Sequence, residues 1–374
     1  MISKKLIARQ KLCYILPEYR ADAHTHLSHV YDFIREISKI FDVCLIIEKG
    51  EMPEDGLGCK SVKVLSLKFA PLRFFEIYWL CAWFFLKGYR DFYTHYSFAA
   101  AASASCAVKV LGGRVFYWNA GEPWKYKRNF FRETFERLTY KLINYLVTGT
   151  ESLKKEYSAH YGIPLEKIKV MPNWINLEKF EVKSEKLKVK EIKSELKIDD
   201  DTKVVLFVHR LSKRKGAHYL PEIIGAFKNE KVVFIIIGDG PEAENSKFEI
   251  RNSKLEDKVR FMGWVPNCEL GPYYSIADIF ILPSEEEGFP RVLLEAMAFG
   301  VPFVAFGVGG VLEIIPSELK SFIVPPENTS FFADMMKKML ELPSRELQNI
   351  GEIEKLWVRQ YDISNVTKIF EKFF

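Results

Sequence analysis

The sequence lacks a hydrophobic run long enough to cross a membrane as a helix. Its most apolar stretch, FFEIYWLCAWFFLKG at 74–88, has an apolar core of about a dozen residues, whereas a spanning helix needs about 20. Two interpretations stay open for this stretch. A buried helix of the first domain is the simpler one. The other is a helix that lies in a membrane surface, which rests on the aromatic residues and on Arg73, Lys87 and Arg90.

The sequence also lacks Cys-x-x-Cys pairs. Several of the six cysteines lie in apolar runs such as KLCYIL and FDVCLII, and we interpret them as reduced core residues of an intracellular protein. The first residues, MISKKLIARQKLCYIL, have no long apolar region followed by a small-residue cleavage site, so we expect no signal peptide. These features predict a cytoplasmic protein, with the inner face of the membrane as a further location.

Little in the composition marks a disordered or nucleic-acid-binding chain. The length of 374 residues is too great for one ordinary compact core and suits two domains. Hydrophobic residues make up 48% of the chain and charged residues 28%, as in a globular protein. The net charge of +5 is mildly basic. It favours anionic partners, and we expect no nucleic acid among them.

Short apolar, β-branched runs alternate with longer helical stretches in both halves of the chain. Examples are LCYIL at 12–16, VCLII at 43–47, VVLFV at 204–208 and VVFIII at 232–237. A spacing of roughly 20 to 30 residues is that of βαβ units. Unbroken apolar strands belong to parallel sheets that are covered on both faces. We therefore predict an α/β protein with two doubly wound, Rossmann-like domains.

A charge-rich segment at 177–201 separates the two series of strands. It is poor in aromatic residues and is interpreted as a linker with a solvated helix. This segment places the first domain at 1–175 and the second at 176–357. In doubly wound sheets, ligands bind outside the carboxyl ends of the strands, so the loops that follow strands are where functional motifs are expected.

Two cations follow the strand VVLFV at its carboxyl end. In HRLSKRKG, Arg210 leaves the strand, and Lys215 comes five residues later with Gly216 behind it. Two cations that converge beside a helix N-terminus make a site for phosphate. The alternative interpretation is a solvated basic loop.

Glycines follow the next strand, VVFIII, in the pattern Gly238-x-Gly240-x-x-Ala243. This pattern is similar to a dinucleotide-binding fingerprint, which would make the protein a dehydrogenase. Such a site needs an acidic residue at the end of the following strand, where the sequence has Met262 and Gly263. We therefore set the dehydrogenase interpretation aside. The glycines still allow a close approach of backbone to a ligand.

The stretch EEEGFPRVLLEAMAFG holds two carboxylates in an unusual setting. Glu287 lies in a turn, Pro290 suits the first turn of a helix, and Glu295 lies about one turn into that helix. The free amides of the first turn favour an anion such as a diphosphate. An ionised Glu295 can accept two hydrogen bonds from a vicinal diol such as ribose. The alternative is that both carboxylates are solvated or paired in salt bridges.

The segment EGFPRVLLE resembles the Glu-x7-Glu motif of glycosyltransferase family 4, whose members are retaining enzymes of the GT-B fold. Five further segments resemble motifs of that family in the family's order, and together they cover most of residues 147–315: VMPNWINLEKF, HRLSKRKG, IIGDGPE, FMGWVPNCELGPYYSIADIFILPS and FGVPFVAFGVGGVLEII. The resemblance implies two Rossmann-like domains that face each other across a cleft. It also implies a C-terminal helix, at about 358–374, that crosses back to the first domain.

The resemblance implies a role for each matching residue. Glu287 would contact the donor sugar near its reacting carbon, and Glu295 would hold the ribose of the nucleotide. Arg210 and Lys215 would bind the diphosphate and stabilise it as it leaves. Further donor contacts are implied for loop residues and helix amides: Gly240, Val265, Gly288, Phe289, Pro290, Arg291 and Val292. Such enzymes need neither metal nor cofactor, so we expect none, and their donors are UDP-, GDP- or ADP-linked sugars.

The first domain departs from the family pattern in two places. Its first loop, LPEYRADAHTHLSHVYDF, has no glycine where the family often has two, so His24, His26 and His29 are candidates for that donor contact. The family often has a histidine after the fourth or fifth strand. Here RVFYWNAGEPW offers Asn119 instead, and His95 is another candidate for a contact with donor or acceptor.

These observations predict a retaining glycosyltransferase that moves a sugar from a nucleotide-diphosphate sugar to a hydroxyl group. The acceptor is expected on the first domain. The tryptophans of that domain and the segment KYKRNFFR at 125–132 favour a lipid-linked glycan, a glycolipid or a polysaccharide precursor, with peripheral contact to a membrane. Three alternatives stay open: a GT-B phosphorylase, a sugar-nucleotide epimerase and a non-catalytic sugar-nucleotide-binding protein.

Overall fold

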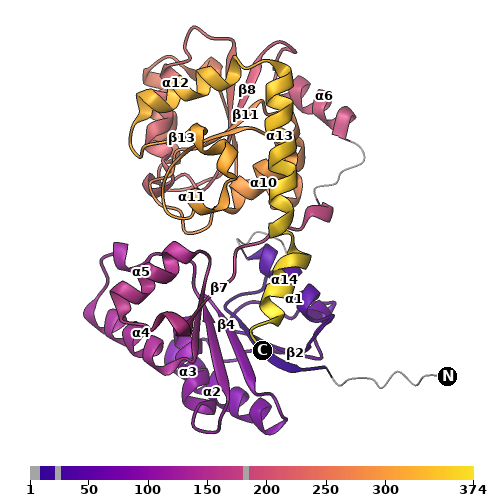
Figure 1. Cartoon of the computed structure of the whole chain (residues 1–374), viewed down its shortest axis with the longest axis vertical. Coiled ribbons are helices and arrows are strands. Elements are labelled where there is room, and N and C mark those ends of the chain that lie inside the picture. The colour runs from indigo at the N-terminus through magenta and orange to yellow at the C-terminus, as the bar shows by residue number, and fades with distance from the viewer. Residues whose placement is uncertain (1–8, 22–26, 180–184) are drawn as a thin grey trace, which may run out of the picture. The chain divides into compact units, whose positions relative to one another are not determined.

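The chain divides into two compact units, each built on one parallel sheet (Figure 1). The computed structural model describes residues 9–21, 27–179 and 185–374. The first unit runs up to Pro172 and takes in the C-terminal segment Ile363–Phe374. The second unit is Asn173–Asp362. The predicted fold class, two doubly wound α/β domains, is therefore confirmed.

The first sheet has seven strands in the order β3-β2-β1-β4-β5-β6-β7. All of its pairings are parallel. The strands are short and lie where the apolar runs predict them: β1 (Lys11–Leu16), β2 (Asp42–Ile47), β3 (Ser61–Val64), β4 (Asp91–His95), β5 (Arg114–Trp118), β6 (Tyr145–Thr148) and β7 (Ile168–Val170).

Helices cover both faces of this sheet. One face packs against α2 (Ala70–Leu86), α3 (Phe98–Val108), α4 (Phe130–Leu142) and α5 (Glu151–Tyr161). The other face packs against α1 (Ser28–Ile37) and α14 (Ile363–Glu371), whose Phe370 contacts Phe33 and Tyr93 edge-on. The C-terminal helix therefore returns to the first unit, as the fold predicts. It begins at Ile363, because residues up to Val358 extend α13 of the second unit.

The second sheet has six parallel strands in the order β10-β9-β8-β11-β12-β13. Its strands are β8 (Lys203–Val208), β9 (Val232–Ile237), β10 (Val259–Gly263), β11 (Ile279–Leu282), β12 (Phe303–Phe306) and β13 (Ile323–Val324). The helices α7 (Leu220–Gly225), α8 (Ala243–Asn252) and α12 (Thr329–Leu340) pack on one face. The helices α6 (Glu185–Glu195), α9 (Gly271–Ile276), α10 (Arg291–Phe299), α11 (Val311–Ile314) and α13 (Ser344–Val358) complete the unit.

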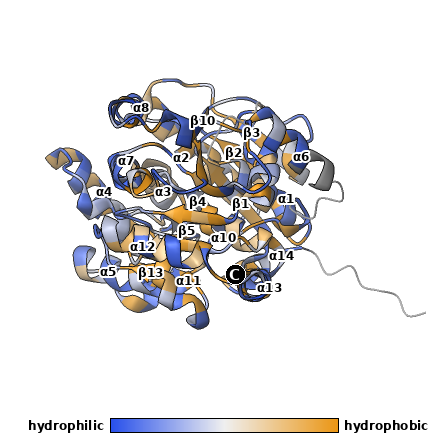
Figure 2. Ribbon diagram, turned by 90° about the horizontal axis from the view of Figure 1, so that it is seen from above, coloured by the Kyte–Doolittle hydropathy of each residue, from blue (hydrophilic) through white to orange (hydrophobic). Residues whose placement is uncertain are grey.

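The apolar strands form because a parallel sheet covered on both faces buries every side chain along its central strands. All six residues of β9 are buried, and so are all five of β4. Figure 2 shows β4 and β5 in hydrophobic colours, whereas α8 and α13 carry many hydrophilic positions. The cysteines in the apolar runs fit this pattern, because Cys13, Cys44 and Cys81 are buried and free.

The helix α2 contains the most apolar stretch of the sequence. It is 17 residues long. No helix in the described ranges is both long enough and apolar enough to pass through a bilayer. Only four of its side chains are buried, Ile77, Cys81, Phe84 and Phe85. The simpler interpretation, a buried helix, is therefore wrong for much of its surface.

Candidate functional site

The order of strands in the second sheet reverses once, between β8 and β11. From β8 the chain moves outward to β9 and β10, and it then returns to add β11, β12 and β13 on the other side. In doubly wound sheets, ligands bind outside the carboxyl ends of the strands at such a switch point. Lys215 follows β8 and Glu287 follows β11, so the sequence places both at this edge.

Glu287 and Lys215 form a buried ion pair at the switch point. The Lys215 Nζ lies 2.8 Å from Glu287 Oε1, and the exposed fractions of the two residues are 7% and 4%. The His209 Nε2 lies 3.0 Å from the same oxygen. Both interactions fall on Oε1, so the second carboxylate oxygen, Oε2, takes part in neither of them.

The charges of this cluster are set by burial and by each other. Burial alone would raise the pKa of Glu287, but the Lys215 ammonium and the His209 ring outweigh it and hold the pKa well below its usual range. Burial lowers the pKa of His209, and the nearby Lys215 and Arg214 add to that effect. Glu287 is therefore an anion at neutral pH, beside a neutral His209 that donates to it from Nε2.

The two acidic residues before Glu287 are paired with the same basic turn. Glu285 Oε1 accepts a hydrogen bond from Tyr219 Oη at 2.9 Å. The Glu286 carboxylate lies 3.5 Å from Arg214, and its carbonyl oxygen accepts from Lys215 Nζ at 3.0 Å. The run of three glutamates therefore does not extend into solvent as a charged loop. Its members are each held by a residue of the loop after β8.

Two glycines allow the loops after β8, β9 and β11 to pack closely. Gly216 has φ +73°, and a Cβ atom there would lie 1.8 Å from the carbonyl oxygen of Pro283. A Cβ atom on Gly240 would lie 2.2 Å from the carbonyl oxygen of Leu211. The close approach that the glycine pattern predicts is thus made to neighbouring loops, and Gly216 brings Lys215 against the loop that holds Glu287.

The helix α10 begins four residues after Glu287, and no side chain caps its first amides. Pro290 is the N-cap, one position before the first turn in which the sequence places it, and no side chain caps this end. The carbonyl oxygen of the buried Phe289 accepts from Asn173 Nδ2 at 3.1 Å. The amides of Arg291 and Val292 belong to the group that has no partner within a helix. Together with the helix dipole they favour an anion at this end.

Glu295 is buried in the second turn of α10 and accepts hydrogen bonds from the turn before α9 and from α9 itself. Its Oε1 accepts from Asn267 Nδ2 at 2.9 Å, and its Oε2 accepts from Tyr274 Oη at 3.1 Å. Arg291 of the same helix lies 3.5 Å from Oε1. An ionised carboxylate has about four acceptor positions, so at least one remains for a further donor.

The remaining residues predicted for the second domain lie around this edge. Arg210 follows His209, is exposed, and forms no ion pair with any other residue in the described part of the chain. Val265 follows β10 and is half-buried against the core. Gly288 lies between Glu287 and the buried Phe289, in the loop that leads into α10.

The residues predicted in the first unit lie in a different environment. His95 ends β4, is fully buried, and its Nδ1 is 2.9 Å from Tyr14 Oη. Asn119 follows β5, and its Oδ1 accepts from the Gly121 amide at 3.0 Å, which fixes the turn. His29 lies in the first turn of α1 and is partly exposed. The predictions for His24 and His26 fall outside the described residues.

Sequence reasoning missed three side chains that complete the site. His209 holds Glu287, and Asn267 and Tyr274 hold Glu295. His209 could have been found, because it is the last residue before Arg210 and follows a buried strand. Asn267 and Tyr274 lie 28 and 21 residues from Glu295, and no spacing rule connects them. Within the described ranges, no three His, Cys, Asp or Glu side chains are grouped so that they could hold a metal ion.

Most of the second unit matches a known protein family. Residues 188–357 match the family Glycosyl transferases group 1. This segment contains the ion pair, the helix α10 and the buried Glu295. The second unit is therefore similar to glycosyl transferases group 1 over most of its length.

Two curated relatives match parts of the chain. An uncharacterised glycosyltransferase of Methanocaldococcus jannaschii is 30% identical over 61% of this chain, and an alpha-monoglucosyldiacylglycerol synthase of Streptococcus pneumoniae is 32% identical over 44%. The aligned parts span only 56% and 40% of the length of these two relatives.

A solved structure matches nearly the whole chain. The Anabaena protein Alr3699/HepE, crystallised with UDP and glucose, superposes with a TM-score of 0.80 at 16% identity. The match covers 98% of this chain and 99% of that one. At this identity the likeness shows the fold alone, which is the GT-B fold.

Proposed function

We propose that the protein is a retaining glycosyltransferase of family 4, which moves a sugar from a nucleotide-diphosphate sugar to a hydroxyl group. The observation that carries the proposal is the buried Glu287–Lys215 pair at the switch point, beside the uncapped α10. A buried anion with one oxygen outside its ion pair suits a sugar hydroxyl. A cation and free amides next to it suit a diphosphate.

The donor would lie along the loops of the second unit. Glu295 would accept a hydrogen bond from a ribose hydroxyl at the position that Asn267, Tyr274 and Arg291 leave available. Lys215, Arg210 and the amides of Arg291 and Val292 would contact the diphosphate. Structures of similar fold were crystallised with UDP, glucose and UDP-glucose, which supports a nucleotide sugar as donor.

Charge stabilisation would supply the main catalytic effect. As the sugar leaves, negative charge gathers on the diphosphate, and preorganised cations and amides stabilise it without a metal ion. The Glu286 carbonyl and the Glu287 carboxylate hold Lys215 in place, so this side chain does not need to rearrange when the diphosphate binds. We propose front-side attack by the acceptor, with the leaving diphosphate taking the proton of the attacking hydroxyl.

The acceptor is proposed to be a lipid-linked glycan, a glycolipid or a polysaccharide precursor. One relative is named an alpha-monoglucosyldiacylglycerol synthase, and two others are named for the biosynthesis of colanic acid and of amylovoran. In the first unit, the residue after His95, Tyr96, has φ +55°, a strained conformation that often marks a functional loop. It lies at the carboxyl end of β4, where an acceptor would meet this unit.

The proposal is tested by following release of nucleoside diphosphate from UDP-, GDP- and ADP-linked sugars, in the presence of a chelator and of bilayer lipids as acceptor source. We expect release from one donor that persists with chelator, and a product whose anomeric proton signals show the donor's configuration. The Glu287→Gln variant should lose this activity, and Glu318→Gln, an exposed position of the same unit, should keep it.

Three results would contradict parts of the proposal. Inversion of the anomeric configuration would exclude the retaining mechanism. Loss of activity with chelator would exclude the metal-free mechanism. A product that is only an isomer of the donor, or formed only with free phosphate, would identify an epimerase or a phosphorylase instead.

A further inference from the structure

The helix α2 of the first unit carries an unbroken apolar stripe on its exposed side. The stripe runs from Phe69, just before the helix, to Leu86 at its end, at spacings of three and four residues that keep it on one face. Its members are large and open to solvent, with exposed fractions of 66, 47, 59, 69, 42 and 82%: Phe69, Leu72, Phe75, Trp79, Trp83 and Leu86.

This stripe lies opposite the side on which α2 packs. The buried residues Ile77, Cys81, Phe84 and Phe85 anchor the helix to the core with α3 and β5. A surface helix normally carries polar residues on the side away from its core. Here that side is apolar, and an exposed apolar surface of this extent marks an interaction site.

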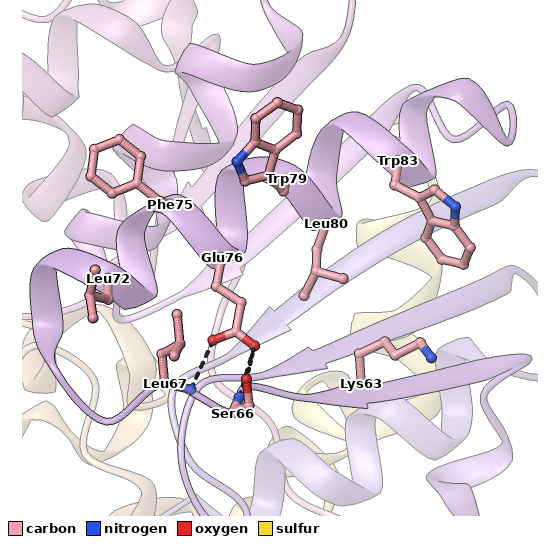
Figure 3. A pocket seen from close by; sticks show the side chains of 9 residues that line it. All are labelled: Lys63, Ser66, Leu67, Leu72, Phe75, Glu76, Trp79, Leu80 and Trp83. Carbon is pink, nitrogen blue, oxygen red and sulfur yellow. Dashed lines mark hydrogen bonds between the residues drawn. The ribbon is translucent and has the colours of Figure 1, made fainter.

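The charges around the stripe are almost all of one sign. Residues 61–90 contain five cations and a single carboxylate, Glu76. That carboxylate accepts from the Ser66 amide and hydroxyl at 2.8 Å and from the Leu67 amide at 3.0 Å, so it faces the loop before α2 (Figure 3). The exposed Lys68 lies just before the helix, and the exposed Lys63 lies on β3, where it lines the same hollow as Trp83 (Figure 3). Lys87 lies at the end of the helix, with its Nζ 4.5 Å from the centre of the Trp83 ring.

A hollow of about 730 Å³ lies beside the stripe, between α2 and the end of β3 (Figure 3). Leu67, Leu80 and Trp83 are among its lining residues, and Lys63 lies at its edge. Because β3 ends here, the hollow is at the carboxyl edge of the first sheet. An apolar hollow with a cation at its rim is suited to an acyl chain whose headgroup is anionic.

We propose that α2 is the surface by which the protein binds a bilayer that contains anionic lipids. The helix would lie in the plane of the membrane, because its other side is fixed in the core of the first unit. The aromatic and leucine side chains would enter the headgroup region. Lys63, Lys68 and Lys87 would contact lipid phosphates.

A second copy of the chain is a poorer match for this surface. A two-fold dimer through α2 would bring each patch against itself. The three lysines around the stripe would then add like charges to the interface, with Glu76 engaged elsewhere. An anionic membrane instead offers the opposite charge, so charge complementarity favours the bilayer.

The proposal is tested by sedimentation of the full-length protein with vesicles of equal parts phosphatidylglycerol and phosphatidylcholine, without donor or acceptor. Binding does not depend on glycosyl transfer, so this experiment stands apart from the test of the proposed function. We expect binding to these vesicles and not to pure phosphatidylcholine. The double variant Trp79→Gln/Leu86→Gln should weaken the partition coefficient by about tenfold or more.

Matched variants test whether vesicle binding depends on this surface or on exposed hydrophobic and basic residues in general. Phe248→Gln/Leu356→Gln removes two hydrophobic residues of similar exposure in the second unit and should bind vesicles as the wild type does. Lys63→Gln/Lys68→Gln/Lys87→Gln should weaken binding and its salt dependence, whereas the exposed Lys228→Gln/Lys254→Gln/Lys320→Gln should not.

Two outcomes would overturn the proposal. The first is vesicle binding that the α2 variants leave unchanged, or that both sets of variants weaken equally. The second is a wild-type dimer in light scattering that Trp79→Gln/Leu86→Gln makes monomeric, with no vesicle binding by either protein, because this result would assign the stripe to a second copy. A circular dichroism spectrum identical to that of the wild type would show that the variants fold.

Discussion

In each unit the order of strands reverses once, between β1 and β4 in the first sheet and between β8 and β11 in the second. The side chains at the two switch points differ in kind. Those of the second unit are polar and paired, since Lys215 and Glu287 form an ion pair and the neutral His209 donates to Glu287. In the first unit, the side chains buried on the two strands that flank this point are aromatic and neutral, because burial raises the pKa of Tyr14 on β1 and of Tyr93 on β4 well above its usual range.

This difference indicates that the two units have different roles although they share one fold. A charged cluster beside free helix amides can bind and stabilise a diphosphate, whereas a buried aromatic cluster contributes stability and offers no charge to a ligand. The same topology thus predicts where a ligand binds but not which ligand. The chemistry depends on a few residues in the loops after the strands.

Removing Lys215 should have the largest effect, because it acts on both stability and turnover. Lys215→Met leaves the Glu287 carboxylate buried with His209 as its neighbour, and the cost should be about 3–5 kcal/mol in the free energy of unfolding. Turnover should fall by about 10²–10³-fold. Urea unfolding and nucleoside diphosphate release measure the two effects. Lys213→Met, on the same turn but exposed, is the control.

A double variant distinguishes the two roles of this pair. Lys215→Met/Glu287→Gln removes both charges and should recover much of the lost stability but none of the turnover. If the double variant recovers no stability, the loss in Lys215→Met comes from packing rather than from an unpaired charge.

Removing Arg210 should affect turnover alone. The side chain is exposed, so Arg210→Ala should change the free energy of unfolding by no more than about 0.5 kcal/mol. If Arg210 contacts the diphosphate, release should fall by about 10²-fold. A variant with unchanged release would place Arg210 outside the donor site.

The charged switch point should also make stability depend on pH. The pKa of His209 is lowered on folding, so the unfolded chain binds the proton first as the pH falls below about 6.5. Stability should therefore fall towards acid, by at most about 1.4 kcal/mol per pH unit from this residue. Glu287 adds a loss only below about pH 4.3, because its pKa is lowered as well.

Urea unfolding between about pH 5 and 7.5 would check this contribution. His209→Gln should flatten the dependence, and the exposed His160→Gln in the first unit should leave it unchanged. If the free energy of unfolding of His209→Gln changes with pH as steeply as that of the wild type, another group titrates in this range.

The smallest effect is expected at the first switch point. Tyr14→Phe removes the hydrogen bond to His95 and should cost about 1 kcal/mol in the free energy of unfolding. Nucleotide affinity, measured by calorimetry, should not change. A loss of affinity in this variant would show that the first switch point contributes to donor binding.

Much of this architecture could be predicted from the sequence, because parallel strands covered on both faces leave long apolar runs at βαβ spacing. The same regularity predicts that Lys215 and Glu287 share one edge, since each follows a strand. The contacts of Asn267 and Tyr274 with Glu295 could not be predicted, because they join separate elements through side-chain geometry that no sequence period records.

The helix α2 shows the limit of composition as a guide. A high content of apolar residues does not tell a buried helix from one with two apolar faces, because both have the same sequence statistics. Only the position of Ile77 and Phe84 in the core, with Trp79 on the opposite side, separates the two interpretations.

We propose that the nucleotide binds at the carboxyl edge of the second sheet, with Glu295 on its ribose. Calorimetry with UDP, GDP and ADP would test it most directly, using the wild type, Glu295→Ala, Glu318→Ala and His95→Gln. We expect one nucleotide to bind the wild type, Glu318→Ala and His95→Gln alike, and to bind Glu295→Ala about 10 to 100-fold more weakly. Equal affinity for Glu295→Ala, or a loss confined to His95→Gln, would contradict it.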